Sequence, residues 1–225
     1  MNNLLNCQLL FAINDFIFKS IFDDIKCAWD VLNRLREYTE ALVNNPPPGY
    51  SRYGDGVIIG HNVEIASTAR IDGPTVIADA SRIRHGAYIR GSVILGKGCV
   101  VGNSSEVKNS LLLDGAQAPH FNYVGDSILG NRAHLGAGAI CSNLRSDGKG
   151  VVIHAQDLDV QTGLRKLGAI IGDGVEIGCG AVLCPGTVIG KNSTVYPLTL
   201  TRGCYPEDSI VKDTYRVVKK EAAPE

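Results

Sequence analysis

The chain has 225 residues, a formal net charge of −1 at pH 7, and 22 basic against 23 acidic side chains. This length predicts one sizeable domain with room for an appendage. The balanced charge gives no basic or acidic surface for nucleic acid or an anionic membrane, so we expect neither as a partner.

The cysteines and the apolar segments indicate the cellular compartment in which the protein is expected. Seven cysteines lie scattered with no CxxC pair, which is typical of reduced thiols in a cytosolic protein. The apolar stretch 9–13 is soon followed by Asp15, and it lacks a basic start and a small-residue cleavage site, so no signal peptide is expected. No apolar run reaches the roughly 18 residues of a membrane span. A cytoplasmic protein is therefore expected.

Residues 1–45 are predicted to form a helical segment that precedes the main domain. Apolar residues recur at spacings of three and four from Phe18 to Leu35, which indicates an amphipathic helix. The run 44–49 contains three consecutive prolines and a glycine, so the helix must end there.

A six-residue aliphatic period then dominates the chain. It is occupied by Ile59, Ile65, Ile71, Ile77, Ile83, Ile89, Leu95, Val101, Val107 and Leu113, and it returns at 129–141 and 171–195. Neither a helix nor an ordinary strand has this period, whereas a parallel β-helix does. We expect a mainly β fold, a left-handed parallel β-helix over 50–202, in which three hexapeptides make one turn and residues 18 apart stack.

Two segments depart from this frame. Residues 143–168 form a long excursion, and such loops in compact folds are usually functional or disordered. The tail 203–225 is polar and mixed in charge. We expect it to cap the coil, because a last rung without a cap would expose unpaired backbone groups.

The 18-residue stacking places charged residues in one column. Asp72, Arg90, Lys108 and Asp126 are spaced by 18, and neighbouring rungs lie roughly 4.8 Å apart. Arg90 beside Lys108 is an unfavourable like-charge pair unless something neutralises it. Either the two aspartates at the ends of the column do so, or the pair holds a phosphate or carboxylate of a ligand.

His120 is the best candidate for a general base. Pro119 stands where the frame expects an aliphatic residue, so the coil is perturbed there and the next side chain is re-aimed. His120 can lie near Lys108, and neighbouring cations disfavour imidazolium, which keeps the base neutral. A zinc site like that of hexapeptide carbonic anhydrases would pair His85 and His120 with a third histidine, but position 125 is glycine. No metal is expected.

Several motifs carry a family resemblance. The segments 106–110, 118–126 and 135–139 resemble the C-terminal acetyltransferase domain of the bifunctional glucosamine-1-phosphate acetyltransferase / N-acetylglucosamine-1-phosphate uridylyltransferase. The segments 143–145 and 162–173 are similar to the archaeal sugar-1-phosphate nucleotidylyltransferase branch. The resemblance covers about residues 50–212. The nucleotidylyltransferase domain has no counterpart here, so pyrophosphorylase activity is not expected.

The resemblance implies roles for the acceptor site. His120 matches the general base that deprotonates the substrate amine. Arg90 and Lys108 match residues that grip the sugar phosphate, Tyr123 matches a substrate contact, and Asn143 matches an asparagine near the acetyl group, which we count with the catalytic residues.

Four further positions are implied in the same way. Lys149 matches a substrate-binding lysine of the archaeal branch, and His134 stands where bacterial members have an asparagine that touches the sugar. Cys179 and Lys212 fall where the family contacts acetyl-CoA. Members of the family form homotrimers with active sites between subunits, so a homotrimer is implied.

Three functions remain open at this stage. The first is an acetyl-CoA-dependent N-acyltransferase acting on an amino-sugar phosphate or a nucleotide sugar. The second is a non-catalytic trimer that binds a sugar nucleotide or regulates a separate nucleotidylyltransferase, which the amphipathic segment favours because it needs an apolar surface to cover. The third is a metal-dependent hydratase, which the missing histidine disfavours.

Overall fold

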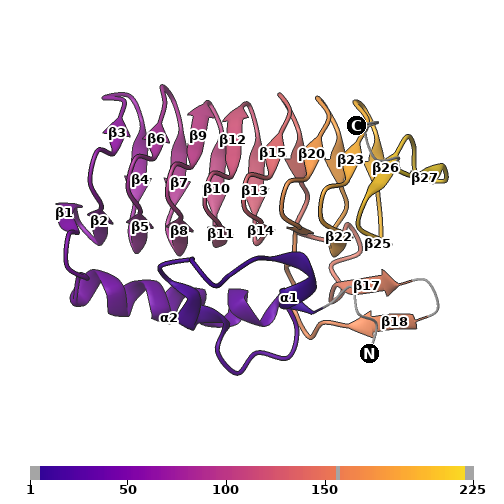
Figure 1. Ribbon diagram of the computed structural model, residues 1–225, viewed down its shortest axis with the longest axis horizontal. Coiled ribbons are helices and arrows are strands. Elements are labelled where there is room, and N and C mark those ends of the chain that lie inside the picture. The colour runs from indigo at the N-terminus through magenta and orange to yellow at the C-terminus, as the bar shows by residue number, and fades with distance from the viewer. Residues whose placement is uncertain (1–5, 156–157, 221–225) are drawn as a thin grey trace, which may run out of the picture.

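Short strands wind into a parallel β-solenoid of about eight turns in the computed structural model, which describes residues 6–155 and 158–220 (Figure 1). Each turn adds one strand to each of three sheets, which form the sides of a prism. The chain runs from sheet A to sheet B to sheet C and back to sheet A. The fold class predicted from the six-residue period is confirmed.

The three sheets have the following strands in spatial order. Sheet A contains β1 (Ser51–Gly54), β2 (Val57–Ile59), β5 (Thr75–Ile77), β8 (Val93–Leu95), β11 (Ser110–Leu112), β14 (Ile128–Leu129), β19 (Ala169–Ile171), β22 (Thr187–Ile189) and β25 (Cys204–Tyr205). Sheet B contains β3 (Glu64–Ile65), β6 (Arg82–Ile83), β9 (Val100–Asn103), β12 (Gln117–His120), β15 (His134–Leu135), β20 (Glu176–Ile177), β23 (Thr194–Val195), β26 (Ser209–Val211) and β27 (Val217–Lys219). Sheet C contains β4 (Arg70–Asp72), β7 (Tyr88–Arg90), β10 (Glu106–Lys108), β13 (Tyr123–Gly125), β16 (Ile140–Cys141), β21 (Val182–Leu183) and β24 (Leu200–Thr201).

The aliphatic frame fills the interior of the prism, but its register slips in the middle of the coil. Ile77 pairs with Leu95 at a spacing of 18, whereas Leu95 pairs with Leu112 at a spacing of 17. The interior residue is therefore Leu112, and Leu113 packs outside the prism against the N-terminal segment. A repeat of five residues ends at Leu112, and a second one ends at Leu129.

This slip corrects two expectations from strict 18-residue stacking. Lys108 pairs with Gly125, so Asp126 lies one position beyond the column. Ala118 takes the interior place that the frame assigned to Pro119, and it is fully buried.

The N-terminal segment lies beneath sheet A and consists of α1 (Cys7–Leu10), the 3-10 turn η2 (Lys19–Phe22) and α2 (Asp30–Asn44) (Figure 1). Helix α2 packs against β5, β8 and β11. Its Val31 and Leu35 are fully buried and share an apolar cluster with Ile94 and Leu111 of the coil. The apolar surface that the amphipathic segment requires is thus the outer face of sheet A.

The excursion contributes a hairpin of β17 (Val152–Ala155) and β18 (Leu158–Gln161), which lies beneath β22 and β25 (Figure 1). Val151 and Ile153 are buried there with Val188. At the far end the coil continues past residue 202 to β26, and β27 pairs antiparallel with β26. Within the described residues, no helix is long and apolar enough to cross a membrane.

Candidate functional site

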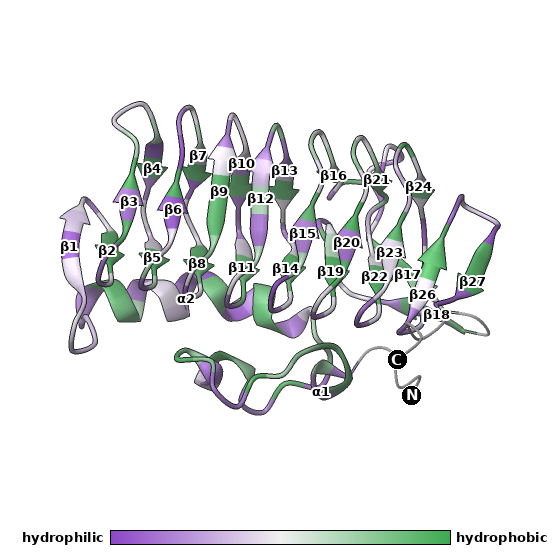
Figure 2. Ribbon diagram, turned by 45° about the horizontal axis from the view of Figure 1, so that its top comes forward, coloured by the Kyte–Doolittle hydropathy of each residue, from purple (hydrophilic) through white to green (hydrophobic). Residues whose placement is uncertain are grey.

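The N-terminal segment and the hairpin cover sheet A and leave the outer faces of sheets B and C uncovered (Figure 2). The outer face of sheet C carries most of the predicted acceptor residues. Its outward positions follow one line across the strands, from Tyr88 through Glu106, Tyr123 and Ile140. Farther along, Leu200 is 49% exposed. The predicted acceptor residues lie on this face or at its two edges.

A polar cluster centred on Asp126 lies at the edge between sheets C and A. The Asp126 side chain is nearly buried, and its carboxylate accepts hydrogen bonds from Lys108 Nζ at 3.0 Å and Asn109 Nδ2 at 2.8 Å. Asn143 Nδ2 donates to the same carboxylate and to the Tyr123 hydroxyl oxygen at 3.2 Å. Lys108, Tyr123 and Asn143, which are far apart in the sequence, are thus brought together.

Glycine at position 125 makes this convergence possible. A Cβ atom on Gly125 would lie 2.6 Å from the Tyr123 hydroxyl and 2.7 Å from Asn143 Nδ2, closer than real Cβ contacts allow. The turns beside it place Asn109 and Asp126 at φ values of 45° and 49°, in the left-handed region that Asn and Asp tolerate better than most residues.

The two predicted phosphate-gripping cations each have a carboxylate partner. Lys108 pairs with Asp126, as the neutralising interpretation expected. Arg90 pairs with Glu106 at 2.6 Å rather than with Asp72, and its guanidinium lies 5.9 Å from the Tyr88 ring centroid. A substrate phosphate on this face would compete with these carboxylates for the two cations.

Asp72 is occupied by other partners. Its carboxylate accepts from Arg70 Nε at 3.0 Å and from the Tyr88 hydroxyl at 2.9 Å. Desolvation raises the pKa of Asp72, but these two hydrogen bonds outweigh it and hold the pKa below its ordinary value.

His120 lies on an exposed turn at the opposite edge of sheet C, where sheet B ends. The turn is held by Asn122, whose side chain is nearly buried. Asn122 Oδ1 accepts from the His120 backbone N–H at 3.0 Å, and Nδ2 donates to the carbonyls of Gly136 at 2.8 Å and Ala139 at 3.3 Å. The His120 side chain makes no hydrogen bond or ion pair with the described residues.

The register of sheet B extends this edge into a column. Gln117 pairs with His134 and His134 with Glu176, so Ala137 neighbours His120 and Cys179 neighbours Ala137. The Gly138 N–H donates to the His120 carbonyl at 3.0 Å, and the Gly136 N–H donates to the Ile177 carbonyl at 2.7 Å. The Ala137 N–H has no partner among the described residues, which leaves it available next to His120.

The two predicted coenzyme positions lie farther along this edge. Cys179 is exposed, two rungs from His120. The Lys212 ammonium lies 5.9 Å from the Tyr196 ring centroid. Lys212 stands four rungs beyond the His120 turn, about 19 Å at the usual spacing of strands.

Two predicted residues do not join the Asp126 cluster. His134 lies on the outer face of sheet B, and its Nδ1 is 2.8 Å from Glu176 Oε2. Lys149 lies in the excursion, where its backbone N–H donates to Asp147 at 3.1 Å, and its side chain makes no hydrogen bond or ion pair with the described residues. Cys141 is a packing residue that is fully buried in the interior of the coil, and this burial raises the pKa of its thiol to about 12.

Asn122 and Asn109 also organise the site, and neither was predicted from the sequence. A signal existed for Asn122, because slim residues stand four places after the aliphatic residue in most repeats. Asn122 stands four places after Ala118, at a corner that holds Ser105 in the preceding turn. A large polar amide at a buried corner needs hydrogen-bond partners there, which marks it as a residue that organises the turn.

A parallel coil with a six-residue period defines a hexapeptide-repeat protein. Residues 71–165 match the GMPPB C-terminal domain family, and residues 168–203 match the bacterial transferase hexapeptide (six repeats) family. One protein named "Bifunctional protein GlmU", from Methanococcus maripaludis, is 34% identical over 222 residues, which are 90% of this chain and 50% of that protein.

Other relatives agree. A second GlmU of that species is 41% identical over 136 residues, 60% of this chain and 33% of that protein. The "Bifunctional sugar-1-phosphate nucleotidylyltransferase/acetyltransferase" of Sulfurisphaera tokodaii is 39% identical over 162 residues, 64% of this chain and 40% of that protein. Among solved structures, a point mutant of AntD, an N-acyltransferase from Bacillus cereus, aligns at 18% identity and a TM-score of 0.45 over 78% of this chain and 91% of that one.

The coil is a hexapeptide-repeat acetyltransferase region homologous to the C-terminal part of these bifunctional proteins. It spans between a third and a half of the length of the relatives named above.

Proposed function

We propose that this chain is an acetyl-CoA-dependent N-acyltransferase that acts on an amino-sugar 1-phosphate or a nucleotide-linked amino sugar. The observation that carries the proposal is the arrangement across sheet C. His120 lies exposed at one edge beside the free Ala137 N–H, and the Asp126 cluster with Lys108 and Asn143 lies at the other edge. The homologous proteins named above as bifunctional acetyltransferases support the same chemistry.

The acceptor would lie across the outer face of sheet C. Lys108 and Arg90 would bind its phosphate by exchanging a carboxylate partner for a phosphoryl oxygen. The Tyr123 hydroxyl and the Asn143 amide would orient the sugar ring, so that its amine reaches His120. Holding the acceptor and the acetyl donor in this way accounts for much of the rate enhancement, because it converts a bimolecular reaction into an effectively intramolecular one.

In the chemical step the amine nitrogen attacks the thioester carbonyl carbon, and neutral His120 takes the proton that the nitrogen loses. The Ala137 N–H would donate to the carbonyl oxygen as it becomes an oxyanion. When the tetrahedral intermediate collapses, the carbon–sulfur bond breaks and the proton passes to the leaving thiolate, which gives an amide and coenzyme A. No covalent enzyme intermediate is needed, since the Cys141 thiol is buried and protonated.

The donor would lie along the column that begins at His120. Exposed Cys179 would contact the pantetheine arm, and Lys212 would bind a phosphate at the far end. We propose a homotrimer in which a second copy covers the apolar part of sheet C, where Ile140 and Leu200 are exposed. His134 and Lys149 are further proposed substrate contacts, although neither hydrogen-bonds with the Asp126 cluster of its own chain.

The test is the release of free thiol from acetyl-CoA with glucosamine-1-phosphate or galactosamine-1-phosphate as acceptor. His120→Ala should lower turnover by roughly 10²–10⁴-fold, the usual contribution of a positioned acid–base group, and leave the circular dichroism spectrum unchanged. His61→Ala, which removes another exposed histidine at a corner of the coil, is the matched control and should keep full activity.

Equal turnover by the His120→Ala protein would remove His120 from the mechanism. The absence of thiol release from the folded wild-type protein with any amino-sugar phosphate or nucleotide-linked amino sugar would contradict the proposal. It would favour the alternative, a non-catalytic protein that binds a sugar nucleotide.

A further inference from the structure

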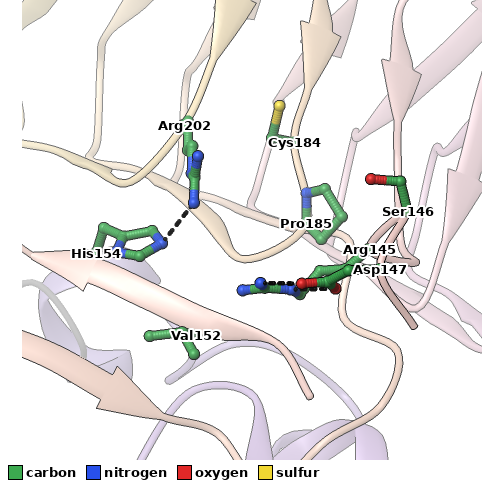
Figure 3. Close-up of a pocket in the computed structure, with 8 residues that line it drawn as sticks. All are labelled: Arg145, Ser146, Asp147, Val152, His154, Cys184, Pro185 and Arg202. Carbon is green, nitrogen blue, oxygen red and sulfur yellow. Dashed lines mark hydrogen bonds and ion pairs between the residues drawn. The ribbon is translucent and has the colours of Figure 1, made fainter. Parts of the chain in front are cut away.

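A cavity lies outside the proposed acetyl-transfer site, between the excursion (residues 143–168) and the edge where sheets C and A meet. Its volume is about 220 Å³, and Arg145, Asp147, His154, Cys184 and Arg202 line it together with small neighbours (Figure 3). No residue predicted to bind acetyl-CoA or the amino sugar is among them. The cavity therefore presents two guanidinium groups that the proposed reaction does not use.

The cavity is a built feature, because the hairpin packs on the coil through two glycines. A Cβ on Gly186 would lie 2.8 Å from Val151 Cγ1, and a Cβ on Gly203 would lie 2.7 Å from the His154 carbonyl oxygen. Both glycines also have positive φ values, 79° and 93°. Val151 and Ile153 are almost fully buried beneath the coil, so strand β17 holds His154 at a fixed distance from Arg202.

Arg145 is fixed at one side of the cavity by a bidentate ion pair. Its Nε and Nη2 atoms lie 2.9 and 2.6 Å from the two oxygens of Asp147. The hydrogen bond from Arg145 holds the pKa of Asp147 well below its ordinary value, so this carboxylate stays ionised. The guanidinium edge that faces away from Asp147 points toward the centre of the cavity in Figure 3.

Arg202 is fixed at the other side without being neutralised. Its Nη2 lies 3.0 Å from His154 Nε2, and His154 Nδ1 lies 2.8 Å from Asp159 Oδ1. A guanidinium only donates, so the ring accepts at Nε2 and donates from Nδ1–H to the carboxylate. Among the described residues Arg202 has no carboxylate partner within ion-pair distance. Its remaining N–H groups keep their positive charge available to a ligand.

We propose that this cavity binds a phosphoryl oxyanion, with Arg202 as its main ligand and Arg145 as the second. Guanidinium groups match the oxygens of phosphate in charge and in geometry, and their planar fork makes paired hydrogen bonds to them. Only one carboxylate, that of Asp147, is among the lining residues, so it does not balance both guanidinium groups. His154 and Asp159 act as positioning residues for Arg202.

The oxyanion site is separate from the proposed acceptor site. Lys108 pairs with Gly125, and the same column continues through Ser142 and Cys184 to Arg202. Four rungs therefore separate Lys108 from Arg202, about 19 Å at the usual strand spacing. The inference does not require acetyl transfer, and it can hold whether or not the chain is an acetyltransferase.

The experiment measures binding to the wild-type protein by calorimetry, with inorganic phosphate, pyrophosphate and uridine diphosphate as separate probes. Arg202→Gln should weaken binding by about tenfold or more, the loss expected for one charge-assisted contact. Arg82→Gln, which removes an equal charge from the outer face of sheet B, should bind like the wild type.

Alkylation of Cys184 locates the ligand. The Cys184 thiol lines the cavity and Cys179 lies on the other edge, so a saturating probe should slow the modification of Cys184 and leave that of Cys179 unchanged. Binding of uridine diphosphate alone would identify a nucleotide as the source of the phosphoryl group, and binding of all three probes would identify the phosphoryl group itself. No binding at millimolar probe, or binding that survives Arg202→Gln, would overturn the proposal.

Discussion

Sheets A and C have the same strand geometry but opposite surroundings. The outer face of sheet A carries Ile58, Val76, Ile94 and Leu111, all fully buried beneath the N-terminal segment. The outer face of sheet C carries charged residues and tyrosines in its first half, and it is exposed (Figure 2). The proposed acceptor residues lie on the exposed face.

The difference follows from the outward positions of the repeat. A strand in a coil has one inward position, filled by the aliphatic frame on every side, so only its outward neighbours distinguish the sheets. Outward β-branched and leucine side chains on sheet A would expose a long apolar stripe, and helix α2 with the hairpin removes that stripe from water. The first half of sheet C has polar outward side chains that need no cover from water, so this face can bind a ligand.

The largest effect is expected from the covered face. Leu35→Ala removes a fully buried side chain between α2 and sheet A, and it should destabilise the protein by about 2–5 kcal/mol. Leu200→Ala, the same change on sheet C at a position that is half exposed in the single chain, should shift the stability of the dissociated chain by no more than about 0.5 kcal/mol, and should cost more only where the proposed trimer contact covers it. Urea unfolding of both variants measures the contrast. Equal losses would mean that sheet C is covered in solution by a second copy.

An intermediate effect is expected at the edge that holds His120. Asn122→Ala removes four side-chain hydrogen bonds at a buried corner, and the groups left unsatisfied should cost about 1–3 kcal/mol. Turnover should fall while the KM for acetyl-CoA stays nearly constant, because the His120 turn loses its support. Asn103→Ala, beside His120 on the preceding rung, is the control. Loss of stability without loss of turnover would show that the turn holds its shape without Asn122.

The coil was predictable because its signal is repeated in almost every turn. The apolar frame, the break after α2 and the excursion all follow from spacing and composition. The slip to 17 residues did not follow, because 111–113 are three consecutive leucines. Hydropathy cannot show which leucine faces inward there, and only the hydrogen-bonded register places Leu112 in the interior.

The candidate site was predictable only in part, because motifs mark some of its residues whereas the register slip changes where others lie. Lys108, Tyr123 and Asn143 lie in recognisable motifs, so the sequence indicated them. Asp126, the shared partner of Lys108 and Asn143, was displaced from its expected column by the slip. The oxyanion cavity gave no signal along the chain. It forms only because the hairpin folds back onto Gly186 and Gly203, and that packing brings His154 to Arg202 across 48 residues.

The smallest effect is expected from chemical modification of cysteines, which should leave the stability unchanged. It should distinguish buried thiols in the interior of the coil from the exposed thiol at its edge. Burial raises the pKa values of the Cys99 and Cys141 thiols to about 12, so at pH 8 both thiols stay protonated and unreactive. Iodoacetamide at pH 8 should therefore modify exposed Cys179 and spare these two, as mass spectrometry of the peptides would show. Modification of Cys141 in the folded protein would contradict its burial.

Saturating acetyl-CoA without an acceptor turns the same measurement into a test of the donor site. If the donor lies along the column from His120 to Lys212, it covers Cys179 and slows the alkylation of that thiol. Lys212→Gln should restore the rate at the same acetyl-CoA concentration, because it removes the proposed phosphate contact about two rungs away. An unchanged alkylation rate would place the coenzyme on another edge of the coil, even if His120 proved to be essential for turnover.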